Sequence, residues 1–256
     1  MVRARTHLVQ AFNRYIMKNL KTQVFSAALF GATVLSFSAS SQVKPDAKKE
    51  VMSAETKAKS DADQDKKAAE WVASLNLNDA EKANRVKEVI TTHLRIIRDW
   101  HNEHPFTTVP AGINPVTGNK LSELDRQIIA NSAMPKTVHE NLMSGLRKDL
   151  TEEQVEAILD KYTIGKVAFT MNGYKSIVPN LTAAEEAEIL KNLKQAREQA
   201  VDYKNMNQIS AIFEIYKTKS EQYLNSNGRS WKQMYKDYTN MIKAKKAADA
   251  AAAKKN

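Results

Sequence analysis

Three histidines with nearby carboxylates are the first side chains in this chain whose spacing could support chemistry. His93 and His104 are eleven residues apart, and His101 and His104 are three apart, so on one helix they would lie on neighbouring parts of its surface. With a carboxylate from Asp99 or Glu103, such a set could hold a divalent metal. The HxxH spacing lacks the glutamate that makes HExxH specific, and histidines beside an apolar stripe can equally make ordinary hydrogen bonds. We therefore predict no metal site and no cofactor.

Pairs of carboxylates are the second candidate, because glycosidases use two of them about 5–10 Å apart. Neighbouring acids occur at Glu152-Glu153 and at Glu185-Glu186, but both pairs lie in the first turns of predicted helices, where the helix dipole favours negative charge. The chain has no GxSxG, no phosphate-binding P-loop and no GxGxxG, so serine hydrolysis and nucleotide binding have no supporting motif. The residue chemistry alone names no reaction.

Aromatic side chains gather with charged ones in the second half of the chain. Rings and polar groups together in a cleft are typical of a carbohydrate site, because an aromatic face packs against the CH face of a sugar. The same residues could equally pack at the edges of helices with their polar ends in water, and both interpretations stay open. The aromatic residues are Tyr162, Tyr174, Tyr203, Tyr216, Tyr223, Trp231, Tyr235 and Tyr238.

The first 41 residues predict export. Five basic residues and no acid occur in this segment, an apolar run extends from Val24 to Phe37, and small residues lead up to Ser41; this is the pattern of a secretory signal peptide. The apolar run is shorter than the about 20 residues that a membrane span needs. Translation could begin at Met1 or at Met17. Because the chain has no cysteine, we expect a periplasmic or extracellular protein without a lipid anchor or a transmembrane segment.

The net charge of +10 comes largely from the two ends of the chain. Without residues 1–41 the net charge is +5, and residues 243–256 carry +4 of that, so residues 42–242 are almost neutral. Proteins that bind nucleic acid concentrate basic charge on their folded domain. We therefore expect no nucleic-acid partner.

The remaining sequence predicts one all-α domain of about seven to nine helices. Residues 42–67 are mostly Ala, Lys, Asp, Ser and Glu and are predicted to form a flexible polar lead, with helix near its end. Residues 68–242 form the helical domain, and residues 243–256 are an Ala/Lys tail. Apolar residues at helical spacing indicate a long helix after Asp79, and capping boxes at 151–154 and 182–185 begin two others. Turn residues predict a loop at 106–120, whose role the sequence does not indicate.

A family resemblance rests on an ordered set of segments between Leu150 and Trp231. They are Leu150-Thr-Glu-Glu-Gln-Val155, Asp160-Lys-Tyr-Thr163, Ile177-Val-Pro-Asn-Leu-Thr182, Ala196-Arg-Glu-Gln-Ala200 and Tyr223-Leu-Asn-x-x-Gly228. In this order and spacing the chain resembles the DUF3826 family of exported Bacteroidetes proteins, for which sugar binding has been proposed. The resemblance implies an exported helical protein of a glycan-degrading bacterium, and it carries no established catalytic residues. Ile164 stands where the family segment is expected to have an aromatic residue.

Charged residues beside a predicted buried stripe single out Arg197, Glu198 and Asp202. Charged groups at the edge of a core need a partner or a ligand, and Lys217 or Asp160 could supply the partner in a purely structural ion network. Together with the aromatic residues and the resemblance, these charges also predict a carbohydrate site. The predicted ligand-binding residues are Asp160, Tyr162, Thr163, Tyr174, Arg197, Glu198, Asp202, Lys217 and Tyr223.

Three functional hypotheses follow. The first is a carbohydrate-binding or accessory protein in glycan utilisation, with an oligo- or polysaccharide as its partner. The second is a carbohydrate hydrolase or lyase that uses Asp160, Glu198 or Asp202 as acid and base. The third is a helical protein-interaction module. The sequence does not specify the ligand, the oligomeric state or a protein partner.

Overall fold

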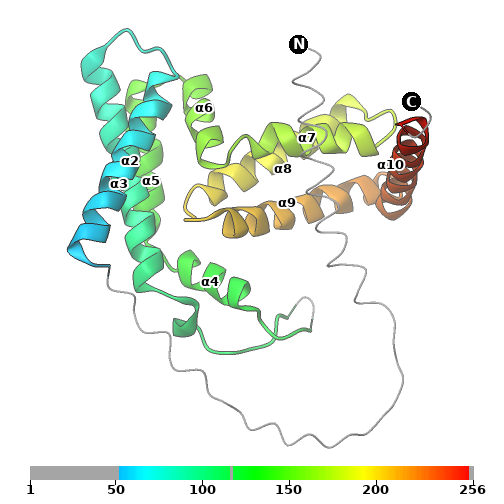
Figure 1. Cartoon of the computed structure of the whole chain (residues 1–256), viewed down its shortest axis with the longest axis horizontal. Helices are drawn as coiled ribbons and strands as arrows, with labels where there is room; N and C mark the ends of the chain where they lie inside the picture. Colours follow the sequence, from blue (N-terminus) through cyan, green and yellow to red (C-terminus); the bar gives the residue numbers. More distant parts are fainter. Residues whose placement is uncertain (1–51, 116–117, 254–256) are drawn as a thin grey trace, which may run out of the picture. The chain divides into compact units, whose positions relative to one another are not determined.

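The computed structural model describes residues 52–115 and 118–253, and this part of the chain is almost entirely helical (Figure 1). It contains nine α-helices and one short 3-10 helix, and its only strand-like pairing is an isolated bridge between Ile113 and Lys120. The predicted all-α fold is therefore confirmed. These elements belong to one unit, Asp46–Asn256, and the predicted signal peptide lies outside the described residues. Among the described helices, none is both long and apolar enough for a membrane crossing.

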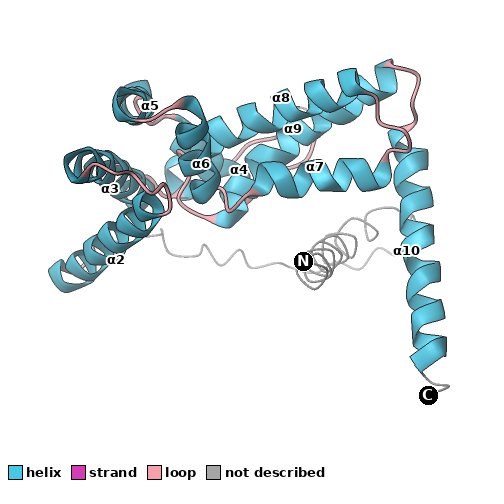
Figure 2. Ribbon diagram, turned by 90° about the horizontal axis from the view of Figure 1, so that it is seen from above, coloured by secondary structure: helices cyan, strands magenta, loops and turns pink. Residues whose placement is uncertain are grey.

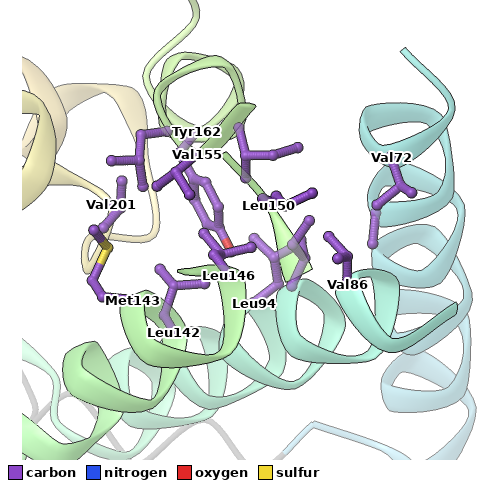
Figure 3. Packing of buried hydrophobic residues seen from close by; sticks show 14 of the residues in the cluster. Val72, Val86, Leu94, Leu142, Met143, Leu146, Leu150, Val155, Tyr162 and Val201 are labelled. Atoms are coloured by element: carbon purple, nitrogen blue, oxygen red, sulfur yellow. The ribbon is translucent and has the colours of Figure 1, made fainter. Parts of the chain in front are cut away.

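The first group of helices surrounds one hydrophobic core. α3 packs against both α2 and α5, and α6 contacts α2 and α5. Val86, Ile90 and Leu94 recur at helical spacing on α3 and are buried, as the apolar pattern predicts. The Tyr162 ring reaches from α6 into this cluster, next to Leu146 (Figure 3). The helices of this group are α2 (Ala54–Ala73), α3 (Ala80–Glu103), α5 (Lys136–Asp149) and α6 (Glu152–Tyr162).

The second group has its own core. α8 and α9 lie side by side (Figures 1 and 2), α7 packs against α8, and α10 contacts α7 and α9. Leu193 of α8 and Phe213 and Leu224 of α9 are almost completely buried between these helices. The helices of this group are α7 (Lys166–Ile177), α8 (Ala183–Ala200), α9 (Met206–Ser226) and α10 (Trp231–Ala253).

The two cores meet around the turn that follows α8. Val201 in this turn packs into the first core, although α8 itself belongs to the second. α6 contacts α8, and the short helix α4 (Glu123–Ser132) contacts both α3 and α9. A 3-10 helix, η2 (Phe106–Thr108), lies against α4 within the predicted loop. The residue after Val201 therefore lies where the two groups of helices meet.

Side-chain caps begin several helices where the sequence predicts them. The capping boxes at Thr151 and Thr182 are both formed, and the Asp79 side chain accepts a hydrogen bond from the Lys82 N–H at the start of α3. A further capping box, between Ser122 and Asp125, begins α4. Each cap satisfies backbone N–H groups that the first helical turn leaves without a partner.

Helix α2 begins earlier than the composition of its segment predicts. The sequence analysis assigns residues 42–67 to a flexible lead with helix near its end, whereas the structure has helix from Ala54. Three ion pairs attach this polar helix to α3: Asp61 pairs with both Arg95 and the buried Arg98, and Arg95 Nη2 lies 2.8 Å from Asp65 Oδ2. A segment with little to bury is thus ordered by charges on a neighbouring helix, which its own composition does not reveal.

Gly145 brings α5 close to α3. A Cβ atom at Gly145 would lie 2.8 Å from Val89 Cγ2 and 2.9 Å from Val89 Cγ1. No larger residue fits there unless Val89 moves, so this glycine sets the distance between the two helices.

Candidate functional site

A cleft of about 740 Å³ lies beside the turn after α8. α5 supplies one wall, and α8 and α9 supply others. Its volume is within the usual range of small-molecule sites. Its lining includes a histidine, a lysine, three carboxylates, three amides and two tyrosines, which are His139, Lys136, Glu140, Glu198, Asp202, Asn131, Gln195, Gln199, Tyr203 and Tyr216.

Asp202 bridges two histidines that come from different helices. Its Oδ1 atom lies 3.0 Å from His93 Nε2 of α3, and its Oδ2 atom lies 2.9 Å from His139 Nδ1 of α5. On the far side of His93, the Nδ1 atom lies 3.2 Å from the hydroxyl of Tyr162. A continuous chain of hydrogen bonds thus runs from the buried Tyr162 through His93 and Asp202 to His139.

The direction of each hydrogen bond follows from what an ionised carboxylate can do. Asp202 can only accept, so Nε2–H of His93 and Nδ1–H of His139 both donate to it. With the proton of a neutral His93 on Nε2, its Nδ1 atom accepts from the Tyr162 hydroxyl. In this arrangement Nε2 of His139 is the ring nitrogen that takes no part in the series of hydrogen bonds from Tyr162 to His139.

The surroundings shift the pKa values of three groups in this chain. The hydrogen bond that His139 donates to Asp202 is the main reason that the pKa of His139 is raised above its usual value. Burial by itself would raise the pKa of Asp202, but the hydrogen bonds from His139 and His93 outweigh burial and lower it. Burial, followed by the charge of Asp202, raises the pKa of Tyr162 well above its usual value. Asp202 therefore stays ionised, and His139 holds its second proton more tightly than a free imidazole.

Glu198 stands at the outer end of the chain. One of its carboxylate oxygens, Oε1, lies 3.7 Å from Nε2 of His139, which is beyond a direct hydrogen bond. The side chain of Glu198 is half exposed and that of His139 is about one-quarter exposed, at 50% and 27%. Both groups are thus accessible in the cleft, in contrast to His93, which is buried behind them.

Residues 61–244 match the family described as "Protein of unknown function (DUF3826)". The chain belongs to the DUF3826 family. This confirms the family predicted from the segments between Leu150 and Trp231. A comparison with curated proteins finds no match. The cleft and the whole hydrogen-bonded chain lie within the matched residues, so they are part of the DUF3826 domain.

The structure brings together only part of the predicted site. Glu198 and Asp202 line the cleft of the DUF3826 domain, and Tyr162 supports it from behind through His93. Tyr203 and Tyr216, from the aromatic set, also line it. The ligand-binding roles assigned from the sequence stay predictions.

Arg197 and Asp160 lie in an ion network between α8 and α6, and neither lines the cleft. Arg197 Nη1 donates to Asp160 Oδ1 at 2.8 Å, and Arg197 Nη2 lies 3.5 Å from Glu156 Oε1. The guanidinium side chain is only 4% exposed. Thr163 lies close by at the end of α6, where its hydroxyl donates to the Leu159 carbonyl. These contacts account for the residues through helix packing, which is the structural interpretation that the sequence left open.

Tyr174, Lys217 and Tyr223 lie among α7 and α9, away from the residues that line the cleft. The Tyr174 hydroxyl donates to the backbone carbonyl of Lys217 at 3.1 Å, and the ring is buried. The Lys217 ammonium pairs with Glu214. Tyr223 is half-buried on α9. The nine predicted residues are therefore divided among three places.

The other two histidines of α3 have separate contacts. His101 Nδ1 lies 3.2 Å from the Gln208 amide, and burial, followed by the charge of Lys204, lowers the pKa of His101 to about 4. His104 stacks on Trp100. In residues 52–115 and 118–253, no group of three or more acidic or histidine side chains is arranged to hold a metal ion.

His139 is the residue of this site that sequence reasoning missed. It lies four positions after Pro135, in a segment with no motif and no second histidine nearby. Its partner Asp202 is 63 positions away along the chain, and His93, the other partner of Asp202, is 46 positions away. A single histidine in a helix gives no local signal, so only the packing of α3, α5 and α8 reveals it.

Proposed function

We propose that the DUF3826 domain of this protein binds a carbohydrate in the cleft beside the turn after α8. The observation that carries the proposal is the composition of the cleft, in which Tyr216 shares one cavity with Gln195, Glu198 and His139. Side-chain amides, carboxylates and imidazoles together donate and accept the hydrogen bonds that sugar hydroxyls require. A tyrosine ring adds an apolar face of the kind that packs against a pyranose.

The polar groups of the cleft have different tasks in this proposal. Glu198 and Gln195 face the ligand directly, and the half-buried Tyr216 supplies the ring. Asp202 acts through His139, because both of its oxygens already accept hydrogen bonds from histidines. The volume of about 740 Å³ has room for a short oligosaccharide rather than only one sugar.

Export and a role in glycan utilisation are part of the same proposal. The pattern of residues 1–41 supports export, and the near-neutral domain supports an uncharged partner better than a nucleic acid. A periplasmic or extracellular accessory protein that holds oligosaccharides fits both observations.

Isothermal titration of the purified chain against a panel of plant and host oligosaccharides tests the proposal. We expect at least one saturable ligand, with its affinity reduced about tenfold or more by Tyr216→Ala and by Glu198→Gln. Tyr238→Ala, a half-buried tyrosine on α10, is the matched control and should bind like the unchanged protein.

Two results would count against the cleft. If Tyr223→Ala loses affinity for the oligosaccharide and Tyr216→Ala keeps it, the binding site lies around Tyr223 of α9, as the sequence predicts, and not in the cleft. Absence of binding across the whole panel would contradict the proposed function.

A further inference from the structure

Asp202 is the carboxylate of the cleft with the most contacts, and its hydrogen bonds are with histidines rather than with a ligand. Asp202 is occupied on both oxygens, by His93 at 3.0 Å and by His139 at 2.9 Å. What it does is fix the His139 ring, because a hydrogen bond at Nδ1 sets both the orientation and the tautomer of an imidazole. The result is an oriented imidazole whose Nε2 atom is directed to the side of the cleft that holds Glu198.

The distance of 3.7 Å between Nε2 of His139 and Oε1 of Glu198 is too long for a direct hydrogen bond. A water molecule that touches both atoms could donate one proton to each, since both are acceptors when His139 is neutral. An oriented imidazole beside such a water is the usual arrangement of a general base.

We propose that His139, positioned by Asp202, activates a water molecule that hydrolyses an ester group on the carbohydrate held in this cleft. The inference rests on the proposed function, because the carbohydrate brings the ester to His139. His139 is the catalytic residue. Asp202, His93 and Tyr162 are positioning residues that act through it.

The reaction needs only the groups of the cleft and water. His139 Nε2 takes one proton from water while the water oxygen bonds to the acyl carbon. The bond between the acyl carbon and the alcohol oxygen then breaks, and His139 returns the proton to that oxygen. The products are acetic acid and a sugar hydroxyl from an O-acetylated sugar, or a sugar carboxylic acid and methanol from a methyl ester, and no electrons are gained or lost. The side-chain amide of Gln195 lines the same cleft and offers N–H donors for the charge that develops on the acyl oxygen.

An ester suits this site better than a glycosidic bond. Glycoside hydrolysis uses two carboxyl groups that both face the scissile bond, and of the three carboxylates here Asp202 faces histidines and Glu140 is exposed on α5. In ester hydrolysis one tetrahedral intermediate carries both the attacking and the leaving oxygen, so one acid–base group can serve both proton transfers, whereas in glycoside hydrolysis the two carboxyl groups flank the scissile bond. Elimination from a uronate is also disfavoured, because the ionised Glu198 beside His139 would repel the substrate's carboxylate.

The first test measures ester cleavage by the full chain on two probes, O-acetylated xylo-oligosaccharides and methyl-esterified oligogalacturonides. Released acetate and methanol are quantified, and the same oligosaccharides after de-esterification serve as ligands in binding measurements. We expect release from at least one probe. His139→Asn should reduce the rate at least about 100-fold. His104→Asn is the matched control, because His104 lies outside the cleft, and it should keep the rate.

The second test asks whether Asp202 acts through His139. The charged groups that share the cleft with His139 are Lys136 and Glu140 of its own helix and Glu198 and Asp202 from the α8 side, while His93 reaches it through Asp202. We expect kcat/KM of the unchanged protein to rise with pH through one ionisation above 6.5. Asp202→Asn should lower kcat more than it changes KM and should move that ionisation to lower pH, since it removes the group that raises the pKa of His139.

Each outcome separates catalysis from binding. Binding of the de-esterified oligosaccharides without cleavage of either ester would overturn this inference and leave the proposed function intact. Ester cleavage without affinity for the parent sugars would contradict sugar binding and keep the catalytic role of His139. An unchanged rate in a folded His139→Asn, or a pH profile that Asp202→Asn does not move, would overturn the role given to that residue. If His139→Asn does not fold, a wild-type profile that does not rise through an ionisation above 6.5 still overturns the inference.

Discussion

Replacing Asp202 with asparagine tests the hydrogen-bonded chain as a structural element. The carboxylate accepts from two histidines, at 3.0 Å and 2.9 Å. An asparagine at this position has one acceptor oxygen and no charge, so only one histidine can still donate to that oxygen and neither has a charged acceptor. His93 is only 2% exposed and has no access to water in exchange.

The structure sets the size of this effect. A hydrogen bond to a charged group contributes about 1.5–3 kcal/mol to stability. Because the Asp202 side chain is 21% exposed and one bond can survive, Asp202→Asn should lower the free energy of unfolding by about 2 kcal/mol near pH 6.

The loss of stability caused by Asp202→Asn should be larger at mildly acidic pH than at pH 9. The pKa of His139 is raised in the folded protein. Its contribution to stability is therefore complete below about pH 6.5, the pKa of an unfolded histidine, and is lost as the pH rises through the folded-state pKa. The pKa of Asp202 is lowered, so its contribution is present above about 3.9 and is lost as the pH falls through the folded-state pKa. The substitution should therefore cost most between about pH 4 and 6.5, and less at pH 9.

Urea unfolding followed by circular dichroism at pH 6 and at pH 9 measures both effects. Asp237→Asn on the exposed side of α10 is the control and should change stability by less than about 0.5 kcal/mol. The same cost at both pH values, or a cost below about 0.5 kcal/mol at pH 6, would refute the reasoning.

Three further predictions concern other parts of the fold. Gly145→Ala should destabilise the protein by about 1–3 kcal/mol, because the new Cβ would lie 2.8 Å from Val89. Val89→Ala in the same chain should recover part of this loss. A Gly145→Ala variant that urea unfolding shows to be as stable as the unchanged protein would contradict this contact. His101 should remain neutral down to about pH 4 because it is buried near Lys204, and an NMR titration of its ring with a midpoint above 6 would disagree. Burial first, and then the charge of Glu214, raise the pKa of Glu221 to about 7, so ionised Glu221 destabilises the folded state at high pH. Glu221→Gln should therefore raise thermal stability at pH 8 and much less at pH 5. Equal effects at both pH values would contradict this.

The helices and the family were predictable because their signals are local. The apolar stripe of Val86, Ile90 and Leu94 repeats with the period of a helix, and the capping boxes at Thr151 and Thr182 lie within four residues. The family prediction used several short segments in a fixed order, which likewise needs no knowledge of the fold. The early start of α2 was harder to predict, since its ion pairs are with residues of another helix.

The candidate site was likewise predictable only where its signals are local. Sequence alone predicted an all-α domain of the DUF3826 family and singled out Glu198 and Asp202 as charged residues beside a buried stripe. Only the tertiary structure placed Arg197 in an ion network with Asp160 and enclosed the Tyr174 ring beside the Lys217 backbone. It alone joined His93, Asp202 and His139, because hydrogen bonds between distant residues depend on how helices pack, and the single histidine of α5 leaves no periodic trace in the sequence.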